Sequence, residues 1–128
     1  MHYDPEVLPV AAEWVELDEK ERILLIEAHH RAARIKLPNA KMHAVFHAIV
    51  ENQIAENLEP VVRAMARLQH EGLSRHDAVH AIGSVSAEHV FEAMKSKSPD
   101  HESTTQARFN AAVERLSANS WREEYGAK

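Results

Sequence analysis

The sequence predicts an all-α protein, a compact bundle of about five helices in which a short third helix separates two longer ones. Apolar residues recur at helical spacing rather than in alternation along the 128 residues. The 5 prolines and 3 glycines mostly stand between these periodic segments, where they begin or end a helix. An apolar content of 45% and a charged content of 27% suit a single domain with one core.

The first two helices are expected over 19–35 and from Pro38 to about residue 57. Asp18 and Glu21 have the spacing of a capping box, in which two residues satisfy each other's backbone N–H groups at a helix N-terminus. Pro38 suits the first turn of the second helix, because a backbone N–H at that position would have no partner within the helix.

The third and fourth helices are expected on either side of a turn at Gly72. Pro60 suits the start of a short third helix, which Gly72 ends. Ser74 followed by Asp77 is a second capping-box pattern, and it opens a fourth helix that continues to about Lys95.

A fifth helix is expected to begin at an Asp100 cap and to end at about Ala118. The structure of the tail is left open, with Trp121 as its expected anchor. The elements together predict one domain, 1–128, made of an N-terminal arm (1–17), a histidine-rich helical core (18–96), a C-terminal helix (97–118) and a tail (119–128).

The composition restricts the chemistry through 10 histidines and the absence of cysteine. Without cysteine there are no disulfides, thiolate zinc fingers, iron–sulfur clusters or cysteine nucleophiles, so a metal would be held by imidazole and carboxylate. A net charge of −5 disfavours nucleic acid as a partner. The N-terminus has no secretory-signal pattern and no apolar run has the length of a membrane span, so a cytoplasmic protein without a membrane partner is expected.

Histidines at helical spacing form the candidate metal site. His43, His47 and Glu51 follow one another at i,i+4 spacing, and His76 and His80 repeat that spacing in the fourth helix. Both faces are otherwise apolar, as is the stripe of the first helix that carries His30. Burying these groups is costly unless each is paired, and one divalent ion would satisfy them together. The predicted ligands are His47, Glu51, His76 and His80, with His43 or His30 as a further ligand or a supporting residue.

Pro60 decides whether the two sets of ligands can meet. In a continuous hairpin that turns at Gly72, Glu51 would lie roughly 30 Å from His76. A break before Pro60 lets the third helix run back by roughly 15 Å, so that the second and fourth helices lie parallel with their histidines level.

Three further residues, Gln53, Glu27 and Asp77, are expected to support the ligands. Imidazole and carboxylate donors indicate Zn, Ni, Fe or Co rather than Mg or Ca. Four protein ligands would make the ion structural, whereas an open position would allow chemistry at bound water, so the sequence leaves enzyme activity undecided. The alternative is a metal-free core in which each histidine bonds a neighbour.

The stretches RAARIKLPNAKMHAVFHAIVENQIA and EGLSRHDAVHAIGSVSAEHVF carry the pattern H-x3-H-x3-E-x-Q, then a short Arg-Leu helix, then H-x3-H. This combination resembles a widespread group of small bacterial proteins known only as domains of unknown function, over most of residues 18–94. The resemblance implies a bacterial protein with no assigned activity, and it singles out His43, His47, Glu51, Gln53, His76 and His80.

The order His30, His47-x3-Glu51 and His76-x3-His80 is also similar to that of hemerythrin-like di-iron bundles. This second likeness implies non-haem iron and oxygen chemistry. The chain departs from it at Gln106, five residues after His101, where those bundles carry a bridging carboxylate.

Three hypotheses about function remain. The first is a metal-binding protein with a structural or storage-like site. The second is a metal-dependent hydrolase or oxygen-using enzyme, with an open ligand position beside a pocket and an acid or base such as Glu27 or Asp77. The third is a helical interaction module that forms a homodimer through an exposed apolar stripe of Phe109, Val113 and Leu116.

Arg63, Arg67 and Arg75 are expected to form a salt-bridged surface.

Overall fold

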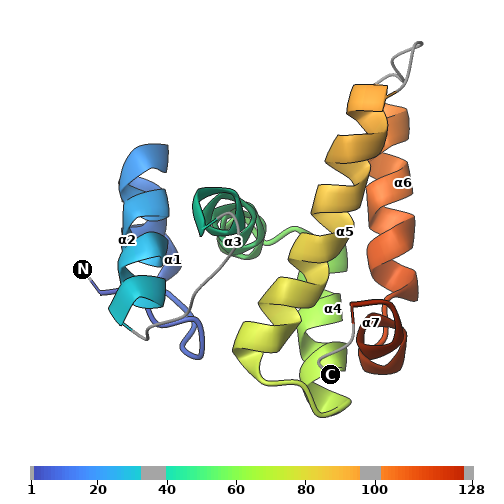
Figure 1. Ribbon diagram of the computed structural model, residues 1–128, viewed down its shortest axis with the longest axis horizontal. Coiled ribbons are helices and arrows are strands. Elements are labelled where there is room, and N and C mark those ends of the chain that lie inside the picture. Colours follow the sequence, from blue (N-terminus) through green and yellow to red (C-terminus); the bar gives the residue numbers. More distant parts are fainter. Residues whose placement is uncertain (1, 33–39, 96–101, 126–128) are drawn as a thin grey trace.

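A computed structural model describes residues 2–32, 40–95 and 102–125. Within these residues the chain forms seven helices and no strand, which confirms the all-α class with two helices more than expected (Figure 1). None of the described helices is both long enough and apolar enough to cross a membrane. The helices are α1 (Ala11–Glu16), α2 (Glu19–Ala32), α3 (Ala40–Ala55), α4 (Glu59–His70), α5 (Arg75–Lys95), α6 (Glu102–Arg115) and α7 (Ala118–Tyr125).

Local sequence signals place the ends of the central helices. The Asp18 and Glu21 side chains each accept the other's backbone N–H, which confirms the capping box at the start of α2. The Ser74 hydroxyl accepts the backbone N–H of Asp77 at the start of α5. Pro60 lies in the first turn of the short helix α4, and Gly72 follows α4 with a φ of 105°, which favours glycine.

The two extra helices lie at the ends of the chain. Helix α1 has only 6 residues and no side-chain cap, and Trp14, which is fully buried, anchors it. Helix α7 begins after Ser117, whose hydroxyl accepts the backbone N–H of Ser120 while the Ser120 hydroxyl accepts that of Ser117. The predicted fifth helix corresponds to α6, which ends at Arg115 rather than at about Ala118, and α7 lies in the tail whose structure the sequence left open. Pro38 and Asp100 lie outside the described residues.

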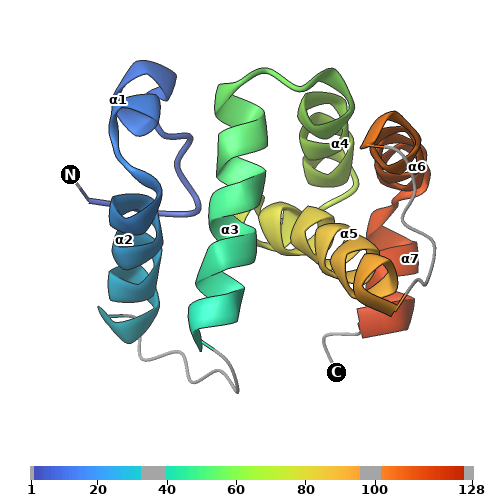
Figure 2. The same ribbon diagram turned by 90° about the horizontal axis from the view of Figure 1, so that it is seen from above.

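The sequence predicts that α3 and α5 lie parallel, and this prediction is wrong: α5 crosses α3 steeply (Figure 2). Gly83 of α5 lies at the crossing, against Phe46 and Val50 of α3. A Cβ at that position would lie 3.7 Å from Phe46 Cβ and 3.9 Å from Val50 Cγ2, both on α3. The histidines of α3 and α5 therefore meet at a crossing point and not along two aligned helices.

Two separate groups of buried apolar residues stabilise the fold. The N-terminal group joins α1, α2 and α3 through Tyr3, Trp14, Ile26, Ala44 and Ala48. The C-terminal group is shared by α3, α4, α5, α6 and α7. It includes Val50, Leu68, Ile82, Phe109, Val113 and Leu116. Phe109, Val113 and Leu116 are at most 9% exposed, so the predicted exposed stripe is wrong: α6 and the residue that follows it contribute these side chains to the chain's own core.

Candidate metal centre

Five histidines from three helices meet where α3 passes between α2 and α5. One ring nitrogen from each residue lies within 4.8 Å of all the others. His30 and His47 are 4% and 2% exposed, and the other three are partly buried. We call this group the histidine cluster: His30 of α2, His43 and His47 of α3, and His76 and His80 of α5.

The Nε2 atoms of all five residues are buried and have no hydrogen-bond partner among the described residues. Five unpaired nitrogens close to one another are unusual, because most buried polar side-chain atoms are paired. In a metal site with bonds of about 2.1 Å, opposite nitrogens would lie about 4.2 Å apart. The observed limit of 4.8 Å is close to that separation, so the cluster fits a single ion.

Hydrogen bonds fix the protonation of two of the rings. His30 Nδ1 lies 2.8 Å from the carbonyl oxygen of Ile26, which can only accept, so the proton is on Nδ1. Tyr3 donates its single hydroxyl proton to Glu51 Oε2 at 2.5 Å, so the Nδ1–H of His47, 3.0 Å away, donates to Tyr3. In the neutral form of both rings Nε2 therefore carries a lone pair that is available to a metal.

The environment also disfavours the charged form of four of the five rings. Burial and the neighbouring histidines lower the pKa of His43 to about 4 and that of His80 to about 3. The same two causes lower the pKa of His47 and His76. Neutral imidazole is the form that binds metal ions, so the cluster is set up for coordination at neutral pH.

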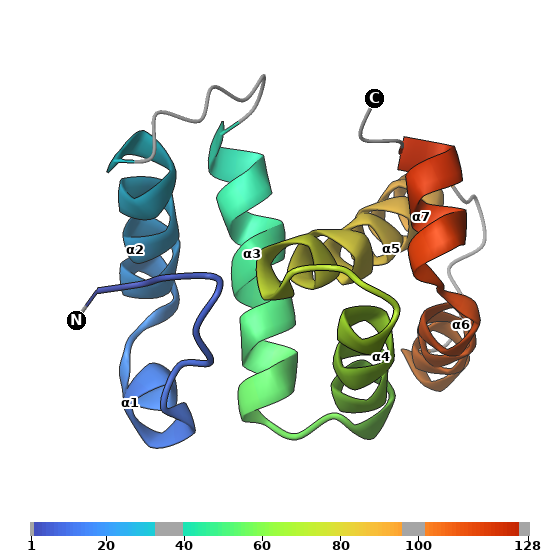
Figure 3. The same ribbon diagram turned by 90° about the horizontal axis from the view of Figure 1, so that it is seen from below.

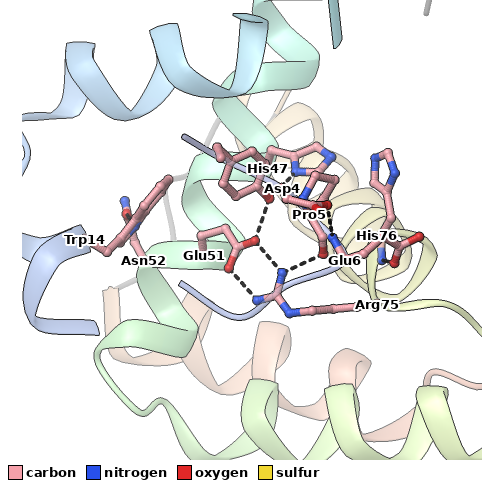
Figure 4. A network of polar contacts seen from close by, with 10 residues as sticks. Asp4, Pro5, Glu6, Trp14, His47, Glu51, Asn52, Arg75 and His76 are labelled. Atoms are coloured by element: carbon pink, nitrogen blue, oxygen red, sulfur yellow. Dashed lines mark hydrogen bonds and ion pairs between the residues drawn. The ribbon is translucent and has the colours of Figure 1, made fainter. Parts of the chain in front are cut away.

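The structure places Glu51, an expected ligand, outside the cluster and in a buried ion pair (Figure 4). Arg75 Nη2 donates to Oε1 at 2.7 Å, Nη1 donates to Oε2 at 2.8 Å, and Tyr3 also donates to Oε2. Burial lowers the pKa of Arg75, but the bonds and charge of Glu51 raise it overall. The Glu51 carboxylate thus supports His47 through Tyr3 and does not face a metal.

Two of the three expected supporting residues have other contacts. Glu27 Oε2 lies 3.7 Å from Arg31 Nη1 on the same helix. The backbone N–H of Asp77 donates to the Ser74 hydroxyl, which caps α5. Gln53 has a buried Oε1 without a partner in the described part of the chain, and no contact with the cluster is recorded for it. Two ring nitrogens of the cluster have hydrogen-bond partners: Tyr3 bonds His47 Nδ1, and the carbonyl of Ile26 bonds His30 Nδ1.

The N-terminal segment, residues 2–10, takes part in the site, which its sequence did not indicate. It passes over α2 toward α3 before it returns to α1 (Figure 3). Besides the Tyr3 bonds, Arg75 donates to the carbonyl of Pro5 at 2.8 Å, and Glu6 accepts the backbone N–H of His76 at 2.9 Å (Figure 4). The segment is too short for a periodic pattern, so no sequence signal places Tyr3.

Arg75 corrects the expected surface of salt-bridged arginines. Only 8% of its side chain is exposed, whereas Arg63 is 55% exposed and pairs with Glu114. Arg67 donates to the carbonyls of Val113 and Leu116. Arg75 immediately precedes His76 in the first turn of α5, and this adjacency to a predicted ligand was the one signal that it belongs to the site.

A pocket of about 250 Å³ adjoins the cluster. Three cluster histidines, His43, His47 and His80, line it. The other lining residues carry no charge, and we call the cavity the apolar pocket: Phe46, Val79, Gly83, Ser84, Ala87 and Trp121.

A scan against protein-family models and searches among curated proteins and solved structures found no match for this chain. The functional interpretation therefore rests on the geometry of the histidine cluster.

Proposed function

We propose that this chain is a metal-binding helical protein that holds one divalent transition-metal ion at the histidine cluster. One observation carries the proposal: five histidines each have a buried Nε2 atom without a partner among the described residues, and one ring nitrogen from each lies within 4.8 Å of the others. A metal ion pairs four or five of them at once, depending on its coordination number, whereas the fold alone leaves each of them unsatisfied.

A water molecule is a weaker explanation for the same arrangement. A buried water makes about three hydrogen bonds and at most four, so it would leave at least one of the five nitrogens unpaired. His30 and His47 both present lone pairs, and both would need a proton from that water. A cation needs no protons from its surroundings and accepts every lone pair.

The donors indicate which metals fit. Imidazole nitrogen suits Zn, Ni, Fe and Co, whereas Mg and Ca prefer oxygen. Zinc in a structural site takes four ligands, so a zinc ion would leave one histidine of the cluster as a neighbour. If all five histidines bind, we propose Ni or Fe, because both accept a fifth and a sixth ligand.

Elemental analysis of the untagged protein tests the proposal directly. We expect about one Zn, Ni, Fe or Co ion per chain, either as purified or after reconstitution and desalting. His76→Ala and His47→Ala should lose most of the metal, whereas His70→Ala, which changes an exposed histidine of α4 outside the cluster, should keep it. A folded wild-type protein that retains none of the four metals, with a melting temperature unchanged by any of them, would refute the proposal.

A metal-dependent enzyme is the second candidate, and the apolar pocket beside the cluster is the observation that favours it. The acids or bases expected for such an enzyme, Glu27 and Asp77, do not line the pocket. An enzyme of this kind would therefore act through the ion and its ligands. Hydrolysis of p-nitrophenyl acetate by the metal-loaded protein, lost in His80→Ala, would support this candidate, and equal rates with and without metal would exclude that hydrolysis.

A further inference from the structure

The charge balance of the histidine cluster is incomplete once an ion is bound. All five donors are neutral imidazoles, and the cluster contains no carboxylate. Glu51, the buried carboxylate nearby, is already neutralised by Arg75 at 2.7 Å. Glu6 and Asp77 act on His76 but are exposed, so water screens their charge. A divalent ion would thus bring a charge of +2 to a largely buried site, which is costly without an anion.

The apolar pocket adjoins the place where that anion would bind. It is lined by three of the five cluster histidines and otherwise by uncharged residues, so the metal is the one positive charge that a ligand there would meet. An inorganic anion would gain little from Phe46, Val79 and Ala87, whereas an organic anion could bury its apolar part against them.

We propose that the metal centre takes a small organic carboxylate, whose charged end binds the ion and whose apolar body fills the pocket beside His43, His47 and His80. This inference rests on the proposed metal site and deepens it by naming the class of ligand.

The size and the polar groups of the pocket agree with this class. A cavity of about 150 Å³ is enough for benzene, and this pocket, at about 250 Å³, accommodates a ring with a carboxylate. Trp121, in the lining, has a buried Nε1–H without a partner among the described residues. The Ser84 hydroxyl donates to the carbonyl of His80 at 2.9 Å, which leaves its oxygen free to accept.

Three probes separate the charged end from the apolar body. Benzoate has both, acetate has the carboxylate without the ring, and benzyl alcohol has the ring without the charge. Binding to zinc-loaded and metal-free protein is measured by calorimetry and by tryptophan fluorescence. We expect benzoate to bind zinc-loaded protein about tenfold or more tightly than acetate or benzyl alcohol, because ring burial and charge pairing add. In metal-free protein this preference for benzoate should disappear.

A variant that fills the pocket gives an independent test. Ala87→Phe places a ring in the space proposed for the ligand, and it should weaken benzoate binding about tenfold while acetate binding and zinc content stay the same. Ala66→Phe, the same substitution at an exposed position of α4, is the matched control and should change none of the three. If Ala87→Phe does not fold, Ala87→Met serves the same purpose, and the comparison of probes on the wild type is unaffected.

The outcomes distinguish the two proposals. If zinc binds and benzoate is no tighter than acetate, or no tighter than benzyl alcohol, the ligand inference is wrong and the metal site stands. If benzoate binds equally well to zinc-loaded and metal-free protein, the ligand does not reach the ion and the inference is also wrong. If none of the four candidate metals binds, both proposals fail together.

Discussion

The guanidinium of Arg75 and the carboxylate of Glu51 form two parallel hydrogen bonds of 2.7 and 2.8 Å, with 8% and 1% of the two side chains exposed. This pair connects α5 to α3, and through Tyr3 it continues to His47. Arg75 thereby binds both oxygens of Glu51, the carboxylate that the i,i+4 spacing predicted as a metal ligand. The relationship therefore explains why the centre is made of imidazole alone.

Removing one partner of this pair should strongly destabilise the fold. Arg75→Met leaves the Glu51 carboxylate buried without a counter-charge, and we expect a loss of about 3–5 kcal/mol in the free energy of unfolding. The double variant Arg75→Met, Glu51→Leu should recover most of it. Urea denaturation measures both, with the exposed Arg63→Met as a control that should change stability far less. Equal effects at Arg75 and Arg63 would contradict a buried pair.

Tyr3→Phe should weaken metal binding while the fold persists. The Tyr3 hydroxyl is the recorded partner of His47 Nδ1, and loss of such a partner costs about 10–100-fold in metal affinity. Competition with a chelator measures the change. Trp14→Phe is the matched control, because it removes a hydrogen bond to Asn52 within the same N-terminal apolar group and should leave affinity unchanged. If both variants lose the same affinity, Tyr3 acts only through packing.

Acid should destabilise the metal-free protein as the pH falls below 6.5. The pKa values of His43 and His80 fall from 6.5 to about 4 and about 3 on folding. Below 6.5 the unfolded chain therefore binds more protons than the folded one, and the free energy of unfolding decreases as the pH falls. Urea denaturation in a chelator at several pH values from neutral to acidic tests this. His43→Gln should flatten the profile, and a wild-type profile already flat through this range would contradict buried neutral rings.

The two helix-associated glycines should respond oppositely to alanine. At Gly83 a Cβ would make ordinary contacts of 3.7 Å or more with α3, so Gly83→Ala should stabilise the fold by about 0.5–1 kcal/mol. At Gly72 the φ of 105° disfavours any side chain, so Gly72→Ala should destabilise by about 1 kcal/mol. Thermal denaturation compares the two. A destabilised Gly83→Ala would mean that the helix crossing is tighter than the contacts indicate.

Local patterns were enough to predict most helix ends and to pair the histidines that belong to the cluster. Asp18 and Ser74 bond within their own first turns, so their caps depend on nothing distant. The i,i+4 spacing likewise places His43 with His47 and His76 with His80 on shared faces, whatever the rest of the chain does.

Features that depend on distant partners could not be predicted in this way. At the steep crossing of α3 and α5, Gly83 lies against Phe46, which is 37 positions earlier in the sequence. Glu51 shares a helical face with His47, yet Arg75 binds both oxygens of its carboxylate. Only the folded chain brings Arg75 and Glu51 together. Tyr3 lies 44 positions before His47 in the sequence and has no periodic neighbours, so nothing local assigns it to the site.

Helices α2 and α5 lie on opposite sides of α3, and the histidine cluster joins them across it (Figure 1). Each belongs to a different apolar group, and the N-terminal group is the smaller of the two. An ion bound by His30 and His76 would cross-link the two halves, and its loss would let α1 and α2 detach as one cooperative unit. Proteases cut such open states in proportion to their population. A cell would then degrade this protein faster as the local supply of its metal falls.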